Sequence, residues 1–185
     1  MKGIFMKKHN SIMKMILAAL FLALAYVMPF LTGQIPEVGA MLCPLHIPVL
    51  LCGFICGPVW GLVVGFVAPL LRCLTLGMPG PLFPDAVCMA FELAVYGAVT
   101  GLMHKILPKK KPYIYLSLIV AMLAGRGVFG VVKMICMGIN GTGYSFALFM
   151  ADAFVNAIPG IIVQIVLIPL LVMILDNPKI LKLKD

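Results

Sequence analysis

Ionisable side chains within apolar stretches are the first candidates for chemistry in this sequence. Arg72, Glu92 and Arg126 each interrupt a long run of mostly apolar residues. Lys133 follows Arg126 by seven residues, nearly two helical turns, so the two side chains share one helix face. Charged groups are costly inside a membrane, and those that persist there usually serve a ligand or a transport path. These residues therefore predict a functional site within the apolar part of the chain.

A polar stripe in the last apolar segment adds to this site. Asp152, Asn156, Gly160 and Gln164 recur every four residues, which places them on one face of a helix. We expect these groups, like the charged residues above, at mid-depth or nearer the outer side of the membrane. Asn156 and Gln164 are therefore candidate substrate-binding residues.

The charges in these segments do not balance. Three cations, Arg72, Arg126 and Lys133, face two anions, Glu92 and Asp152. A polar cavity with a spare positive charge suits a small anionic or zwitterionic solute, and arginine grips a carboxylate through two parallel hydrogen bonds. We expect Arg126 to hold that carboxylate, with help from Lys133 or Arg72. The alternative is a permanent ion pair, for instance of Glu92 with Arg126, which would close the fold without a ligand.

Sequence motifs for other chemistries are absent. The chain has no G-K-[ST] phosphate loop, no H-E-x-x-H and no G-x-S-x-G, so neither a nucleotide site nor a hydrolase centre is indicated. Cys52 and Cys56 lie near His46, so a metal site is conceivable, but such cysteines are more often small apolar residues that pack within spans. We expect no metal, no cofactor and no enzymatic activity.

The elements that must position these residues are transmembrane helices. Of the 185 residues, 63% are hydrophobic and 11% are charged, whereas soluble domains carry about 25% charged residues. With about 20 residues to a span, this composition predicts an all-α integral membrane protein, a single bundle of six transmembrane helices. Ala23-Leu24-Ala25 resembles a signal-peptide cleavage site, but the apolar run continues to Leu31, which favours an uncleaved first helix. Within the single domain 1–185, the expected spans are 11–31, 44–57, 58–76, 84–107, 113–137 and 147–175.

The positive charges set the expected topology. The net charge is +8, and the lysines cluster beside apolar runs at the N-terminus, at 105–111 and at the C-terminus. With six spans these clusters share one side, and the loops 32–43, 77–83 and 138–146 on the other side contain no Lys or Arg. The positive-inside rule therefore favours six spans over five and places both termini in the cytoplasm, with the protein in the plasma membrane. Such clusters suit contact with anionic lipid and do not indicate nucleic-acid binding.

Small residues recur at a spacing that lets helices approach closely. Glycines stand every four residues through the second and third expected spans: Gly53, Gly57, Gly61 and Gly65. We expect these glycines to serve helix packing. Ala19 and Ala23 make a similar pair on the first span, and packing within the fold is the default interpretation for them too.

One run of residues resembles a known family. It begins Leu45-His46-Ile47-Pro48, reaches Gly57-Pro58 and continues through Gly61 and Gly65. It is similar to the "(H/D)-(I/L)-P-…-G-…-G-P-…-G-…-G" run of the substrate-binding S components of energy-coupling factor (ECF) vitamin transporters, six-helix membrane proteins of about this length. Asn156-Ala157-Ile158-Pro159-Gly160 resembles the family's last-helix motif. The resemblance covers nearly the whole chain, its His-Ile-Pro form is most similar to pantothenate-type members, and His46 joins the candidate substrate-binding residues.

The resemblance implies a division of labour between subunits. This protein would capture a vitamin from outside, with pantothenate favoured and folate, pyridoxine or riboflavin as other candidates. It would then dock on a transmembrane coupling subunit served by two cytoplasmic ATPases. Ala19 and Ala23 match the family's A-x-x-x-A, which implies contact with the coupling subunit in place of internal packing. The rival interpretation is a stand-alone secondary carrier for a small anionic solute; such carriers are often built from repeats, but residues 1–92 and 93–185 show no convincing similarity.

Overall fold

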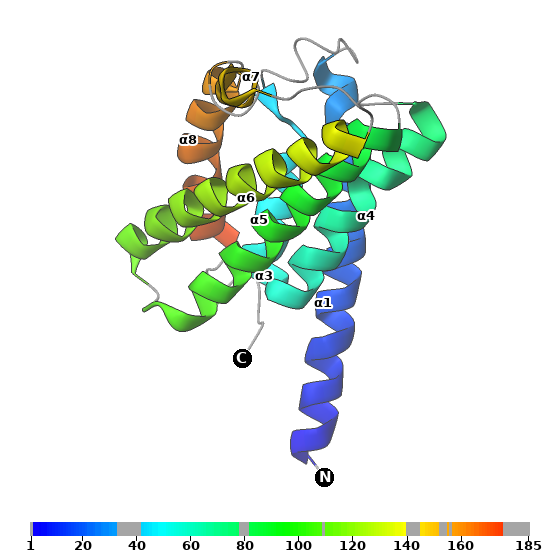
Figure 1. Ribbon diagram of the computed structural model, residues 1–185. Helices are drawn as coiled ribbons and strands as arrows, with labels where there is room; N and C mark the ends of the chain where they lie inside the picture. The colour runs from blue at the N-terminus through cyan, green and yellow to red at the C-terminus, as the bar shows by residue number, and fades with distance from the viewer. Residues whose placement is uncertain are drawn as a thin grey trace.

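The computed structural model contains only helices and their connections in the part of the chain that it describes, residues 2–32, 42–77, 82–108, 110–139, 145–151, 155 and 157–175 (Figure 1). In chain order the helices are α1 (Lys2–Val27), the short 3-10 helix η1 (Met28–Thr32), α3 (His46–Cys56), α4 (Pro58–Leu76), the π-helical turn η2 (Leu82–Ala86), α5 (Val87–Ile106), α6 (Lys111–Ile139), α7 (Phe146–Met150) and α8 (Ile158–Leu175).

The number of full membrane spans differs from the expected six. Among the described residues five stretches are long and apolar enough to cross a membrane: Ser11–Phe30, Pro58–Leu76, Leu82–Ile106, Lys111–Ile139 and Ile158–Leu175. α3 is apolar but has 11 residues, which is about 17 Å of helix against a hydrocarbon core of about 30 Å. Gly57 ends α3 in a backbone conformation with φ of 96°, and Pro58 begins α4. The all-helical membrane class is confirmed, whereas the six-helix bundle is not.

The last predicted span, 147–175, is described in part. We expected one kinked helix there, and the structure describes α7 and α8, while residues 152–154 and 156 between them lie outside the described residues. Pro159 stands in the first turn of α8, where a proline breaks no helical hydrogen bond, and Pro169 lies inside the same helix. At the start of α7 the Ser145 hydroxyl accepts a hydrogen bond from the Leu148 N–H, which caps this short helix.

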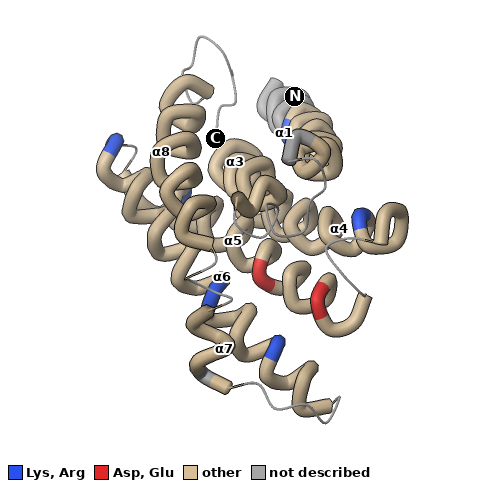
Figure 2. Tube along the Cα trace, turned by 90° about the horizontal axis from the view of Figure 1, so that it is seen from above, with Lys and Arg blue, Asp and Glu red and all other residues tan. Residues whose placement is uncertain are grey.

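α5 is the central helix of the bundle. It packs against α3, α4 and α6, and Figure 1 shows it between α4 and α6. The span that contains α5 is 56% buried, whereas the span in α1 is 17% buried. Seen from above, α3 lies among α1, α5 and α8 (Figure 2). Side chains that α5 carries toward α3 or α6 are therefore well enclosed by neighbouring helices.

Glycines allow α4 and α5 to pack with their backbones in contact. A Cβ added at Gly61 would overlap the carbonyl of Gly97, and one at Gly65 would overlap the carbonyl of Leu93. These contacts show that the two helices run antiparallel, and they confirm the packing role predicted for both glycines, as does a similar overlap of Gly53 with α5. Gly57 differs, because nothing lies within 4 Å of its Cβ position and its positive φ serves the turn between α3 and α4.

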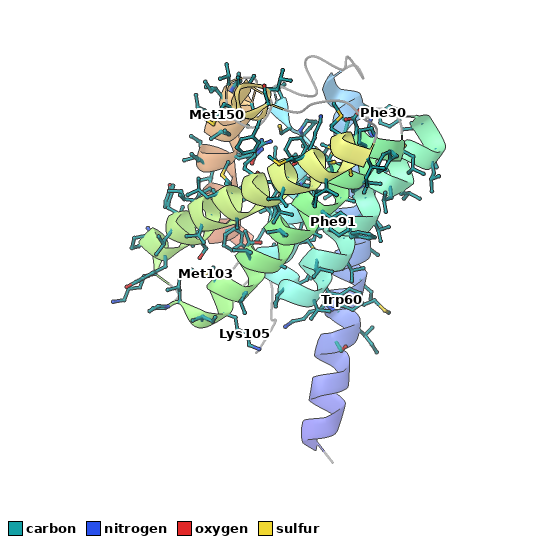
Figure 3. The ribbon with its side chains drawn as sticks, in the orientation of Figure 1. Phe30, Trp60, Phe91, Met103, Lys105 and Met150 are labelled. Carbon is teal, nitrogen blue, oxygen red and sulfur yellow. The ribbon has the colours of Figure 1, made fainter. Side chains whose placement is uncertain are left out.

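The outer surface of the bundle is apolar, as contact with lipid requires. Val59, Leu74 and Ile139 are 71%, 73% and 74% exposed. Figure 3 shows further apolar side chains on the outside, among them Phe30 and Phe91, which are both exposed. In water such a surface would aggregate, so its extent over several helices supports a membrane location independently of the composition.

Candidate ligand-binding site

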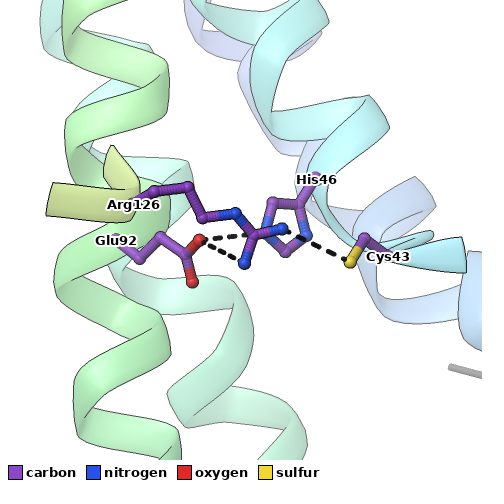
Figure 4. A network of polar contacts seen from close by, with 4 residues as sticks. All are labelled: Cys43, His46, Glu92 and Arg126. Atoms are coloured by element: carbon purple, nitrogen blue, oxygen red, sulfur yellow. Dashed lines mark hydrogen bonds and ion pairs between the residues drawn. The ribbon is translucent and has the colours of Figure 1, made fainter. Parts of the chain in front are cut away.

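A buried polar cluster joins three helices near the middle of the bundle (Figure 4). Glu92 extends from α5, Arg126 from α6 and His46 from the first turn of α3. Arg126 Nη1 lies 3.1 Å from Glu92 Oε1, and His46 Nε2 lies 3.7 Å from the same oxygen. Arg126 Nη2 also contacts Cys43 Sγ at 3.9 Å. The cluster therefore contains the ion pair that the sequence left open as an alternative to a free Arg126.

The cluster is fully enclosed by its neighbours. His46 is 1% exposed, Glu92 2% and Arg126 6%. The Tyr96 ring packs edge-on against the His46 imidazole with ring centroids 5.2 Å apart. Gly125 makes room for this ring, because a Cβ there would lie 2.7 Å from Tyr96 Cε1. Tight packing on all sides holds the carboxylate and the guanidinium in a single geometry.

The ion pair does not use all of the polar atoms in the cluster. Arg126 Nε, His46 Nδ1 and Tyr96 Oη are buried and have no hydrogen-bond partner within the described ranges. Buried donors and acceptors normally have hydrogen-bond partners, and each one left without a partner costs about 1–3 kcal/mol. A bound solute with hydroxyl or amide groups would satisfy several of them together.

Lys133 belongs to a second ion pair. Its Nζ lies 3.3 Å from Asp85 Oδ1 and 5.3 Å from the centre of the Phe129 ring. The Asp85 side chain is 39% exposed, so this pair is nearer to solvent than the Glu92–Arg126 pair. The charge balance drawn from the sequence omitted Asp85 and needs correction, because this carboxylate neutralises one of the three cations.

Arg72 lies apart from both ion pairs. It sits on the buried face of α4 and is 5% exposed. Its Nη1 has no hydrogen-bond partner among the residues that the structure describes. Of the three cations predicted to share the site, the structure places Arg126 beside Glu92, pairs Lys133 with Asp85 and leaves Arg72 separate.

Gln164 is the remaining described member of the predicted site. It is 1% exposed on α8, and neither its Oε1 nor its Nε2 has a hydrogen-bond partner in the described part of the chain. Gly160 is buried on the same helix, as the four-residue spacing predicted. α8 packs against α3 and α6, the helices that carry His46 and Arg126. Asn156 and Asp152, predicted to extend this stripe, lie outside the described residues.

No group of three His, Cys, Asp or Glu side chains in the described ranges is arranged to hold a metal ion. All six cysteines are free thiols. Cys52 and Cys56, which the sequence left as a conceivable metal site with His46, are both buried on α3. The His46–Glu92–Arg126 cluster offers recognition by charge and by hydrogen bonds.

Comparison with known proteins identifies the family. A family model described as "ECF transporter, substrate-specific component" matches residues 13–172. The chain belongs to this family. No curated protein and no solved structure matched the chain. ECF substrate-specific components are membrane-embedded transporter subunits and not enzymes, and they work with energy-coupling and ATPase subunits on a small-molecule substrate.

The first helix of this substrate-specific component presents the predicted alanine pair outward. Ala18 and Ala25 are 2% and 0% exposed and face the bundle. Ala19 and Ala23 are both exposed. Internal packing, the default interpretation of their spacing, is therefore wrong for this pair. Two small side chains on the free face of a membrane helix leave room for close approach by another helix.

Sequence reasoning about the substrate-specific component missed Tyr96, Cys43 and Asp85. A signal for Asp85 was present, because Asp85 and Glu92 are seven residues apart, as are Arg126 and Lys133. Two acids and two bases with equal spacing on antiparallel neighbouring helices can pair in a single register. Tyr96 follows Glu92 by four residues and so lies on the same helix face, and this spacing was a signal for Tyr96 in the sequence.

Proposed function

We propose that this protein captures a vitamin or similar micronutrient from outside the cell and delivers it to an ATP-driven importer. The observation that carries the proposal is the His46–Glu92–Arg126 cluster, a polar group enclosed within a bundle whose outer surface is apolar. Ionisable groups at such a position are unfavourable in lipid and are retained where they serve a solute. The hydrogen-bonding atoms that the ion pair leaves unused give the cluster capacity for a polar ligand.

Pantothenate is the substrate we favour, with folate, pyridoxine and riboflavin as the other candidates. The support is the His-Ile-Pro sequence at the start of α3 and, among the described buried groups, two arginines, Arg72 and Arg126, against one carboxylate, Glu92. Pantothenate carries two hydroxyls, an amide and a carboxylate. The hydroxyls and the amide match the hydrogen-bonding atoms of Arg126, His46, Tyr96 and Gln164 that have no partner among the described residues. Asn156, next to the start of α8 in the sequence, is proposed as a further contact.

The energy for import comes from partner chains. We propose that Ala19 and Ala23 form the contact with the transmembrane coupling subunit, which two cytoplasmic ATPases drive. Support comes from their exposure on α1 and from the absence of any nucleotide motif in the sequence. We also propose a single domain 1–185 that crosses the plasma membrane six times with both termini in the cytoplasm, α3 being the short second crossing. The loops without Lys or Arg support that topology.

Mass spectrometry of small molecules that co-purify with the protein in detergent tests the capture function. We expect one vitamin at near-stoichiometric amount. Reconstitution in vesicles then separates this proposal from a stand-alone secondary carrier. Uptake that requires ATP and the added coupling and ATPase subunits supports the proposal, whereas uptake by the purified chain alone, driven by an ion gradient, refutes it.

A further inference from the structure

Among the described residues, Arg72 is the embedded cation that no ion pair includes. The other two are paired, Arg126 with Glu92 and Lys133 with Asp85. No ion pair within the described ranges includes Arg72, and its Nη1 has no hydrogen-bond partner there. A buried arginine without a counter-charge is strongly unfavourable in lipid, so the position calls for an anion.

The Arg72 side chain does not extend from α4 to the aqueous interface. Basic side chains near the ends of membrane helices often extend to the interface and keep the charged group hydrated. Arg72 stands four residues before Leu76, where α4 ends, so this route is within reach. A side chain that used it would be exposed, but Arg72 is 5% exposed. It shares the inward face of α4 with Gly65 and Ala68, so its charge is held inside the protein.

The helix register sets the depth of Arg72 relative to the buried ion pair. In the antiparallel register fixed by the glycine contacts of α4 and α5, Arg72 falls beside Ala86. Ala86 is six residues from Glu92, which is about 9 Å along the helix axis. Asp85 is at nearly the same level as Arg72, but its carboxylate already binds Lys133. Figure 2 shows the same pattern, with basic positions of α4 and α6 around acidic positions of α5 and of the turn before it. Among the described residues, this level therefore carries one positive charge in excess.

We propose that Arg72, and not Arg126, binds the anionic group of the transported substrate, and that the substrate is a small acid with a carboxylate or similar group. The inference rests on the proposed capture function and assigns one contact within it. A guanidinium holds a carboxylate by two parallel hydrogen bonds, and the attraction is stronger in a low-dielectric interior than in water. The Glu92–Arg126 pair carries no net charge and would meet the uncharged polar part of the same molecule, about 9 Å deeper.

The test compares an acid with its neutral analogue. Wild type and Arg72→Gln, stripped of ligand in detergent, are titrated by calorimetry with pantothenate and with panthenol, in which an alcohol replaces the carboxylate. We expect the wild type to bind pantothenate about ten- to a hundredfold more tightly than panthenol. Arg72→Gln should weaken pantothenate binding by the same factor of about ten to a hundred and leave panthenol binding within about twofold. Lys105→Gln, an equal charge change at an exposed position near the end of α5, is the matched control and should keep the preference.

A second variant and a wider set of probes keep the inference open to refutation. Arg72→Lys keeps the charge but lacks the paired donors of the guanidinium, so it should retain part of the preference for pantothenate over panthenol. This variant still tests the inference if Arg72→Gln fails to fold. If Arg72→Gln retains the preference for the acid, or if the wild type prefers panthenol, pyridoxine or riboflavin, the role given to Arg72 is wrong while the capture function stands. If the wild type binds neither pantothenate, folate nor any neutral probe, the proposed vitamin specificity fails, and the role of Arg72 fails with it.

Discussion

Removal of the charge on Arg126 tests whether the central ion pair is structural. Arg126 Nη1 and Glu92 Oε1 are 3.1 Å apart, and the side chains are 7% and 2% exposed. Truncation of one partner in a buried pair leaves the other charge unpaired and costs about 3–5 kcal/mol. In a chain of this size 1 kcal/mol corresponds to about 2–4 °C in melting temperature. Arg126→Gln should therefore lower the melting temperature by about 6–20 °C.

A second substitution should reverse most of this loss. In the double variant Arg126→Gln with Glu92→Gln, the two neutral amides can hydrogen-bond to each other and no buried charge remains. The measurement is thermal unfolding in detergent of the wild type, both single variants and the double variant. The matched control is Lys133→Gln, which breaks the more exposed pair with Asp85 and should cost no more than about 1 kcal/mol.

The result that refutes this reasoning is a small effect of the single change. If Arg126→Gln melts within about 2 °C of the wild type, or if the double variant is no more stable than Arg126→Gln, the pair does not support the fold. Arg126 would then be free to hold a substrate carboxylate, as the sequence first suggested. Calorimetric titration of the same samples with pantothenate would show that role as a loss of affinity that Glu92→Gln does not restore.

Three further outcomes are expected. Gly97→Ala should destabilise the protein, because the added Cβ overlaps the backbone of Gly61, whereas Gly127→Ala on α6 meets nothing within 4 Å and should be neutral; denaturant unfolding checks both. Ala19→Leu should abolish ATP-driven uptake and leave substrate binding and stability intact, because this side chain is exposed on α1, and a variant that instead melts early in detergent contradicts the docking role. A cysteine at position 110 in a cysteine-free background should resist a membrane-impermeant thiol reagent added to intact cells, and labelling there would overturn the proposed topology.

The parts of the fold that depend on composition and long apolar runs were predictable from the sequence. The span predicted at 58–76 has the bounds of α4, and that predicted at 84–107 contains α5. The form of the last span was harder to predict, because a proline such as Pro159 is compatible with a kink and with the first turn of a helix. The shortness of α3 was visible in the sequence as the early Gly57-Pro58 break, whereas its prediction as a crossing rested on the charge pattern.

The buried site was predictable in its members and not in its pairings. Glu92 and Arg126 stood out because charges are rare in apolar runs, and their ion pair was one of two alternatives. The choice between a free and a paired Arg126 depends on the register of α5 against α6, which single-helix periodicity does not contain. Asp85 was overlooked because it lies at the start of a predicted span, where a charge needs no explanation.

The two ion pairs between α6 and the α5 region have a mechanical consequence. Glu92–Arg126 and Asp85–Lys133 lie seven residues apart on each side, so both form in one register. A slide of one helical turn, about 5.4 Å, would break both pairs at once, and the Glu92–Arg126 pair would be broken at a depth where water is scarce. α5 and α6 therefore move as one rigid unit, and the close glycine contacts make α4 part of it. A movement that admits or releases a solute is therefore expected in the less buried helices, which include α1 and α8.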